Sequence, residues 1–236
     1  MEHIKRKKYK SVFFDLDHTL WDYDTNSKET LHELYRSHDL HSKGVHSFDD
    51  FFNTFKTVNF NLWEQFDRGL ITSDVIRTER FKQCLEPFQA FEEKRCEALT
   101  NDYLAMCPMK CNLMPKTLET LDYLSSHYNL TIITNGFDEI QQLKLTSGNL
   151  HRYFDHVITS QKAGHRKPAR EIFEYALRLN NVHSHEAIMI GDNPITDIGG
   201  AQNAAIDAVL FNPEKLKYNI TVDFEISCLH ELREFL

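Results

Sequence analysis

The segment from Ser11 to Leu20 places two carboxylates directly after a short apolar run, and this feature restricts the fold more than any other. Val12–Phe14 is typical of a strand that a parallel sheet buries on both faces, so Asp15 is predicted at its carboxyl end, where open α/β sheets bind ligands. Two carboxylates within three residues are costly to bury without a cation, and hard divalent ions take such oxygen ligands. Asp15 and Asp17 therefore predict a metal site, with a polar turn that caps a helix as the alternative.

Three later segments carry polar side chains near the ends of predicted strands and loops. The run Leu130–Ile133 ends in a hydroxyl, an amide and a glycine before a helix, a combination that suits a phosphate cradle. A loop after the strand near His156 ends in a lysine, with Pro168 predicted at the first helical position, and the run Ala187–Ile190 is followed by two carboxylates. Each feature could instead be an ordinary helix cap or a solvated surface residue. The residues concerned are Thr134, Asn135, Gly136, Lys167, Asp192 and Asp197.

Taken in order, these segments closely resemble the four motifs of the haloacid dehalogenase-like hydrolase superfamily. The motifs are Asp-Leu-Asp-His-Thr from Asp15, Thr-Asn-Gly from Thr134, Lys-Pro from Lys167, and Gly-Asp-Asn-Pro-Ile-Thr-Asp from Gly191. Any of the later three is common by itself, whereas the ordered set is specific and covers most of the chain.

The resemblance implies a role for each motif residue. Asp15 would attack phosphorus and form an aspartyl-phosphate, with Asp17 as general acid to the leaving oxygen and then as base for the hydrolytic water. Lys167 and Thr134 would complete the catalytic group by offsetting and hydrogen-bonding the phosphate charge. Substrate-binding positions are Thr19, Asn135 and Gly136. The Mg²⁺ site comprises Asp15, Asp17 through its backbone carbonyl, Asp192, and Asp197, which orients waters or Lys167.

The second carboxylate of the first motif favours a phosphatase. Superfamily members that displace halide need no acid for the leaving group, and they lack a carboxylate two residues after the nucleophile. Asp17 is present here. The alternatives are a phosphatase for sugar phosphates, pyrophosphate or another small phosphometabolite, and a phospho-accepting signalling or binding protein without turnover.

Spacing and length predict a doubly wound, Rossmann-like parallel sheet interrupted by a helical insertion. Strands are expected near Ser11, Leu130, His156, Ala187, Ala208 and Phe224, and a short helix over Leu229–Leu236. Residues 22–112 carry few strand signals; helices are expected from Phe48 to Asp67, over Ser73–Leu85 and over Phe91–Met106. We therefore expect a core domain of residues 1–21 and 113–236, and a helical cap domain of residues 22–112, which in this superfamily closes over the site.

A narrower resemblance concerns the substrate. Residues 13–21, 61–63, 69–73 and 133–137 resemble bacterial house-cleaning nucleotidases of the superfamily, which dephosphorylate pyrimidine and noncanonical nucleoside monophosphates. A nucleoside monophosphate is therefore the favoured substrate. The cap positions expected to read the leaving group are Asn61, Trp63, Arg77 and Arg80, although an aromatic stripe at helical spacing usually packs a core.

Composition limits the partners. The formal charge of -8 argues against binding to nucleic acid polymers, so local groups must capture an anionic substrate. No segment has the apolar length needed to cross a bilayer, and five irregularly spaced cysteines are typical of free thiols in the cytoplasm. We expect a cytoplasmic enzyme for a small phosphorylated metabolite, without a membrane partner, as a monomer or homodimer.

Overall fold

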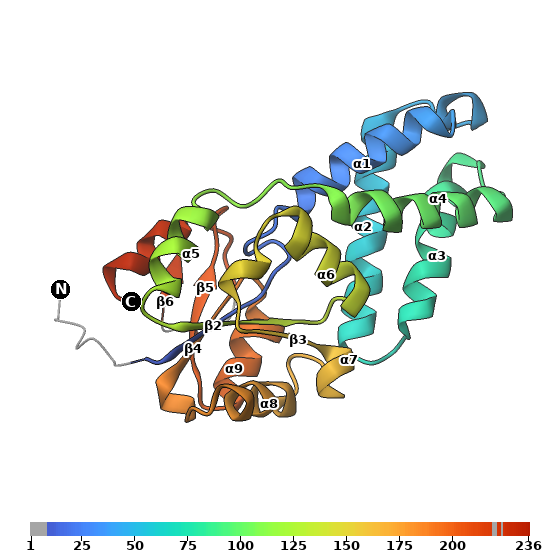
Figure 1. Ribbon diagram of the computed structural model, residues 1–236. Helices are drawn as coiled ribbons and strands as arrows, with labels where there is room; N and C mark the ends of the chain where they lie inside the picture. Colours follow the sequence, from blue (N-terminus) through green and yellow to red (C-terminus); the bar gives the residue numbers. More distant parts are fainter. Residues whose placement is uncertain (1–8, 219–220, 223) are drawn as a thin grey trace. The chain divides into compact units, whose positions relative to one another are not determined.

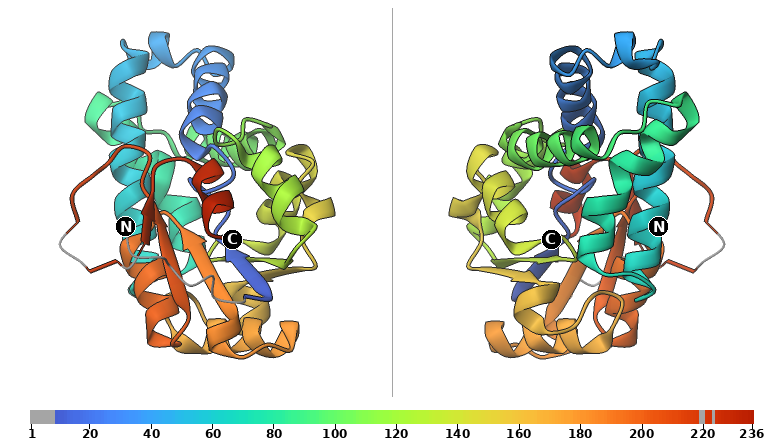
Figure 2. Two further views of the ribbon diagram at one scale, coloured as in Figure 1. Left: turned by 90° about the vertical axis from the view of Figure 1, so that its left-hand side faces the viewer. Right: turned by 90° about the vertical axis from the view of Figure 1, so that its right-hand side faces the viewer.

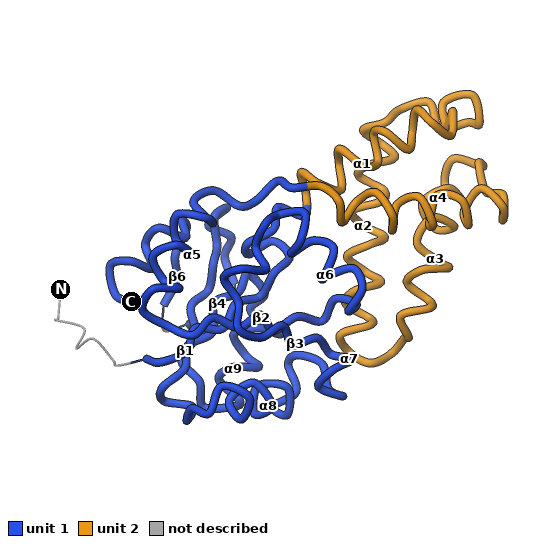
Figure 3. Tube along the Cα trace, viewed as in Figure 1, with its two compact units in different colours: residues 1–23, 111–236 blue, residues 24–110 orange. Residues whose placement is uncertain are grey.

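The computed structural model describes residues 9–218, 221–222 and 224–236 and divides into two compact units (Figures 1 and 3). Unit 1 consists of residues 1–23 and 111–236, and unit 2 of residues 24–110. The limits expected from sequence for the insertion, 22 and 112, each differ by two residues from those of unit 2.

Unit 1 contains a six-stranded parallel sheet in the order β3-β2-β1-β4-β5-β6. This is the doubly wound arrangement that the sequence predicts. Successive strands are added on one side of β1 up to β3, and on its other side from β4 onward, so the strand order reverses between β1 and β4. These two strands are parallel neighbours, with Phe14 opposite Ile190. The strands are β1 (Ser11–Phe14), β2 (Asn129–Thr134), β3 (His156–Thr159), β4 (Ala187–Gly191), β5 (Asp207–Phe211) and β6 (Phe224–Ile226).

Helices cover both faces of this sheet (Figures 1 and 2). One face carries α5 and α6, and the other carries α8 and α9. Every residue of β1 and β4 is buried, because a sheet covered on both sides leaves its central strands no contact with water. The helices are α5 (Thr117–Ser125), α6 (Asp138–Ser147), α7 (Ser160–Ala163), α8 (Arg170–Asn180) and α9 (Gly200–Asn203).

The main apolar cluster joins α8 to one face of the sheet. Phe13 and Met189 contribute from the two central strands, and Ile172 and Phe173 contribute from α8. All four side chains are fully buried, so the strand ends that follow them are anchored on a packed layer.

The two crossings between unit 1 and the insertion lie next to each other. Trp21 forms an antiparallel bridge with Leu113, and the Met114 amide donates to the Leu20 carbonyl at 2.9 Å. The segment that leaves β1 is therefore tied to the segment that returns to α5.

Unit 2 is helical. In α2 the buried positions include Phe51, Phe55, Leu62 and Phe66, at the three- and four-residue spacing of one helix face. Ser47 caps this helix by accepting a hydrogen bond from the Asp50 amide at 3.2 Å. The helices are α1 (Tyr23–Ser37), α2 (Phe48–Asp67), α3 (Ser73–Leu85) and α4 (Glu93–Met106).

Four local expectations differ from the structure. The loop expected after the strand near His156 begins with the short helix α7, because Thr159 caps that helix by accepting a hydrogen bond from the Lys162 amide at 3.2 Å. Pro168 lies before α8 rather than in its first turn, because the helix begins at Arg170 after an extended Ala169. Helix α4 begins at Glu93, not Phe91, since Glu92 is extended. The terminal segment forms a 3-10 helix over Leu229–Glu234. Among the described residues, no helix combines the length and apolar character required to cross a membrane.

Candidate active site

Three carboxylates meet at the carboxyl edge of the sheet in unit 1. Asp15 follows β1, Asp192 follows β4, and Asp197 lies in a π-helix over Pro194–Gly199. One oxygen from each of the three lies within 4.8 Å of the others. The side chains converge because β1 and β4 are adjacent parallel strands that end at the same edge, at the point where the strand order reverses.

Lys167 lies between two of these acids. Its ammonium is 2.6 Å from Asp15 Oδ1 and 2.6 Å from Asp197 Oδ1. All three residues are buried. Burial disfavours the Lys167 ammonium, but the charges of Asp15 and Asp197 raise its pKa above the ordinary value. Lys167 is therefore held as a cation beside Asp15.

The single ammonium of Lys167 offsets only part of the negative charge of the three carboxylates. Burial raises the pKa of Asp15 to about 7, although Lys167 opposes this shift and Asp197 adds to it. Burial likewise raises the pKa of Asp192 to about 6, against the lowering effect of His18. Three carboxylates face one ammonium, so the fully ionised cluster carries an excess of negative charge.

This donor set fits a divalent cation. Carboxylate oxygens are the ligands that Mg²⁺ prefers, and the excess charge of the cluster is of the right sign and size to be offset by a doubly charged ion. Lys167 already binds Asp15 and Asp197, whereas Asp192 accepts a hydrogen bond from the neutral Thr19 Oγ1 at 3.1 Å. Asp15 and Asp192 are therefore the most suitable carboxylate ligands.

Both oxygens of the third carboxylate, that of Asp197, accept hydrogen bonds. The Asn193 amide donates to Asp197 Oδ2 at 3.0 Å, while Lys167 binds the other oxygen. Gly191 lies so close that a Cβ atom there would overlap the Asp197 side chain. These contacts favour a role for Asp197 in orienting Lys167.

Asn135 fixes the main chain at Lys167. Its Nδ2 donates to the Lys167 carbonyl at 2.9 Å, and its Oδ1 accepts from the Lys167 amide at 2.8 Å. The side chain thereby joins the loop after β2 to the loop before α8. Thr134 is buried beside it and accepts from the Gly136 amide at 3.0 Å, which leaves the hydroxyl proton available to another acceptor.

Asp17 has different partners from the other motif acids. Lys144 Nζ lies 2.6 Å from Asp17 Oδ1, and Gln141 Nε2 donates to Oδ2 at 3.1 Å. Both partners come from α6, and sequence reasoning missed them. The available signal was their three-residue spacing, which puts them on one face of a helix that starts just after the second motif.

The four cap positions have unequal exposure within unit 2. Asn61 is exposed on α2, and Trp63 and Arg77 are partly exposed. Arg80 is buried: it donates to Asn59 Oδ1 at 3.2 Å, and its guanidinium lies 4.9 Å from the centre of the Tyr103 ring. These contacts assign Arg80 to the interior of unit 2.

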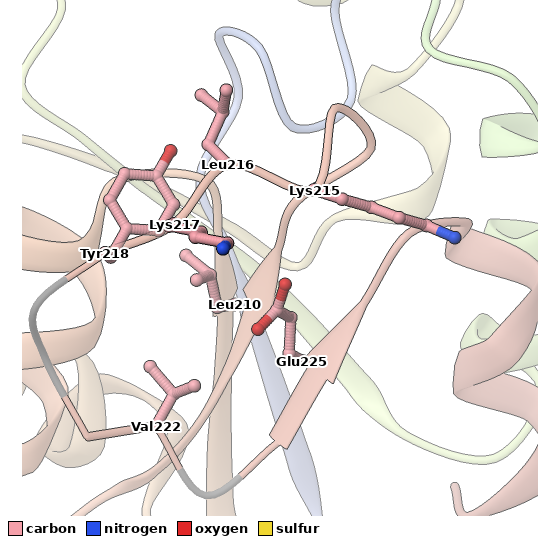
Figure 4. Close-up of a pocket in the computed structure, with 7 residues that line it drawn as sticks. All are labelled: Leu210, Lys215, Leu216, Lys217, Tyr218, Val222 and Glu225. Carbon is pink, nitrogen blue, oxygen red and sulfur yellow. The ribbon is translucent and has the colours of Figure 1, made fainter.

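A separate cavity of about 390 Å³ lies beside the ends of β5 and β6 (Figure 4). Lys215, Leu216, Lys217 and Tyr218 line it, and none of the predicted core-motif residues does. Burial raises the pKa of Tyr218, and the negative charge of Asp192 adds to the shift. The cavity is therefore distinct from the carboxylate cluster but within its electrostatic reach.

Comparison with known proteins identifies the family of the chain. Pyrimidine 5'-nucleotidase YjjG from Escherichia coli is 31% identical over 97% of this chain and 98% of its own length. Pyrimidine 5'-nucleotidase PynA from Streptococcus pneumoniae is 28% identical over 89% of this chain and 86% of its own. The crystal structure of YfnB from Bacillus subtilis, named as a HAD-hydrolase and bound to magnesium, covers 97% of this chain and 98% of YfnB, with 26% identity and a TM-score of 0.86. The family model "Haloacid dehalogenase-like hydrolase" matches residues 12–211, and the chain therefore belongs to this family.

Proposed function

We propose that this protein is a Mg²⁺-dependent phosphomonoesterase, and specifically a 5'-nucleotidase for pyrimidine or noncanonical nucleoside monophosphates. The observation that carries the proposal is the contact of Lys167 with both Asp15 and Asp197, next to Asp192 at one edge of the sheet. This arrangement provides a nucleophile, a cation for the phosphate charge and carboxylates for a metal.

Asp15 acts as the nucleophile. Its oxygen attacks phosphorus in line with the ester oxygen and forms an aspartyl-phosphate, so that one difficult displacement becomes two easier ones. Lys167, already in contact with Asp15, offsets the charge of the approaching phosphate. The Thr134 hydroxyl and backbone amides near Gly136 donate hydrogen bonds to the phosphate oxygens.

Asp17 acts first as the general acid and then as the general base. It donates a proton to the leaving oxygen, and its carboxylate then accepts a proton from the water that hydrolyses the aspartyl-phosphate. Its side chain is partly exposed, unlike that of Lys167, so water can reach it.

Asp15, Asp192 and the backbone carbonyl of Asp17 would hold the Mg²⁺. When bound, the ion supplies positive charge that stabilises the transferring phosphoryl group. Asp197 binds Lys167 and the Asn193 amide, which favours an orienting role.

The substrate assignment rests on the relatives. YjjG and PynA are named as pyrimidine 5'-nucleotidases, and each aligns with most of this chain. We infer that Asn61, Trp63 and Arg77 contribute to reading the leaving group, since these cap side chains are at least partly exposed. The cysteines within the described part of the chain form no disulfide, which supports a cytoplasmic location.

The test is phosphate release with Mg²⁺ from UMP, dUMP, TMP, purine monophosphates, sugar phosphates and pyrophosphate, with Asp15→Asn as the control. We expect a preference for pyrimidine monophosphates that the variant abolishes. Preference for sugar phosphates would retain the chemistry and reject the substrate. A phosphoryl group that persists on the protein, or no release from any ester, would indicate a signalling or binding protein instead.

A further inference from the structure

We propose that Lys144 and Gln141 are positioning residues that hold the Asp17 carboxyl group where it exchanges a proton with the leaving oxygen. The inference rests on the proposed phosphatase function and extends it to a helix outside the four motifs. Lys144 contacts Asp17 Oδ1 at 2.6 Å, and Gln141 contacts Oδ2 at 3.1 Å. Each oxygen of the carboxyl group thus has its own donor on α6.

Lys144 is an unusual lysine because it is almost fully buried, with only 5% of its side chain exposed. Its ammonium lies 4.5 Å from the centre of the Trp21 ring and 5.5 Å from that of Tyr23. A buried ammonium is costly unless charged or aromatic groups compensate it, and here Asp17 and the two rings do so. The lysine is therefore fixed within unit 1 rather than mobile at its surface.

Gln141 reaches Asp17 only because residue 136 has no side chain. It is 1% exposed, and a Cβ atom at Gly136 would overlap its amide group. The glycine of the second motif therefore makes room for the Gln141 contact with Asp17, in addition to any contact of its backbone with phosphate.

These two contacts fix the plane of the carboxyl group and leave each oxygen a second lone pair. In the first step the Asp17 proton moves to the ester oxygen as the P–O bond breaks and the Asp15–phosphorus bond forms. In the second step Asp17 takes a proton from the attacking water, the Asp15–phosphorus bond breaks, and phosphate leaves. Both transfers require Asp17 within hydrogen-bond reach, and a misplacement of about 1 Å can cost about 100-fold in rate.

The test compares two leaving groups by kcat/KM, which reports only the steps up to phosphorylation of Asp15. The alkoxide leaving group of UMP needs a proton, whereas the weakly basic nitrophenolate of p-nitrophenyl phosphate does not. We expect Lys144→Met to lower kcat/KM about 10- to 100-fold for UMP and less than about 3-fold for p-nitrophenyl phosphate. Lys144→Arg, which keeps a cation of similar reach, should recover part of the loss with UMP.

Gln141→Met provides a second variant, since methionine has nearly the length of glutamine and suits a buried position. Gln142→Met is the matched control, because Gln142 is the next residue of α6 and is exposed. We expect Gln141→Met and Gly136→Ala to reduce activity on UMP more than on p-nitrophenyl phosphate, and Gln142→Met to leave both unchanged.

Equal losses on both esters in Lys144→Met and Gln141→Met, with thermal unfolding like that of the wild type, would overturn the inference. If Lys144→Met does not fold, the comparison of the two esters with Gln141→Met is the deciding test. If the wild type favours another alkyl phosphate over UMP, that ester takes its place. Inactivity of the wild type on every ester would reject the proposed function itself, and the inference with it.

Discussion

The backbone of Gly191 lies against the carboxylate of Asp197, and a Cβ atom at position 191 would overlap that side chain. We therefore predict that Gly191→Ala displaces Asp197 and, through it, Lys167. The expected result is a loss of activity of more than about 10-fold and of about 1–3 kcal/mol in the free energy of unfolding. Steady-state kinetics and urea unfolding measure the two effects.

Gly199→Ala is the control for this substitution. A Cβ atom there would lie 3.5 Å from the Pro194 carbonyl oxygen, an ordinary contact distance. Gly191 ends β4 and Gly199 ends the π-helix after it, and of these two glycines Gly191 is the one that lies against the carboxylate cluster. Equal losses in the two variants would contradict the role assigned to Gly191.

Mg²⁺ should stabilise the protein more at pH 8 than at pH 5. The folded-state pKa values, about 7 for Asp15 and about 6 for Asp192, lie above the ordinary value of 3.8. The folded protein therefore binds these protons more tightly than the unfolded chain, so the stability they supply is present at low pH and lost as pH rises through 6 to 7. Mg²⁺ binds the ionised carboxylates of Asp15 and Asp192, so its binding should stabilise the folded protein most at high pH, where the stability supplied by the protons has been lost. Melting temperatures with and without Mg²⁺ measure the effect, and a shift that is independent of pH would argue against carboxylate ligands.

Removal of the Lys167 ammonium should cost both activity and stability. Lys167→Met leaves Asp15 and Asp197 buried without their cation, and breaking a buried ion pair in this way costs about 3–5 kcal/mol. The loss should be smaller at low pH, where the acids are protonated. Lys162→Met is the control: its side chain is 48% exposed and 3.9 Å from Asp138, so we expect a loss of about 1 kcal/mol or less.

Arg80 should prove to be a structural residue of unit 2. Its contacts with Asn59 and Tyr103 are internal to the helical unit, so Arg80→Ala is expected to lower stability by about 2–4 kcal/mol. Arg68→Ala, which removes an exposed pair with Glu64, should change stability by about 0.5 kcal/mol or less. A variant at position 80 with unchanged stability but altered substrate preference would restore Arg80 as a specificity residue.

The sheet was predictable because its strands are short apolar runs that end in chemically distinctive residues. The strands near Ser11, Leu130 and Ala187 are confirmed, and the residues after two of them, Asp15 and Asp192, meet as parallel topology requires. The sequence identifies the side chains that follow each strand, and the parallel topology places those side chains at the same edge of the sheet.

The partners of Asp17 were not predictable in the same way. Lys144 and Gln141 lie in the middle of an ordinary helix, where a lysine and a glutamine usually face solvent. Only the packing of α6 against the loop at Trp21 reveals that these two are buried. Arg80 shows the reverse: an arginine expected at a surface is enclosed by aromatic rings, a contact that depends on tertiary packing.

The bridge between Trp21 and Leu113 has an evolutionary consequence. Because the insertion departs and returns through adjacent, hydrogen-bonded segments, its length and sequence can change without altering the path of the chain through the sheet. Substitutions, insertions and deletions within residues 24–110 can therefore accumulate while the residues at the carboxyl edge of the sheet stay in place.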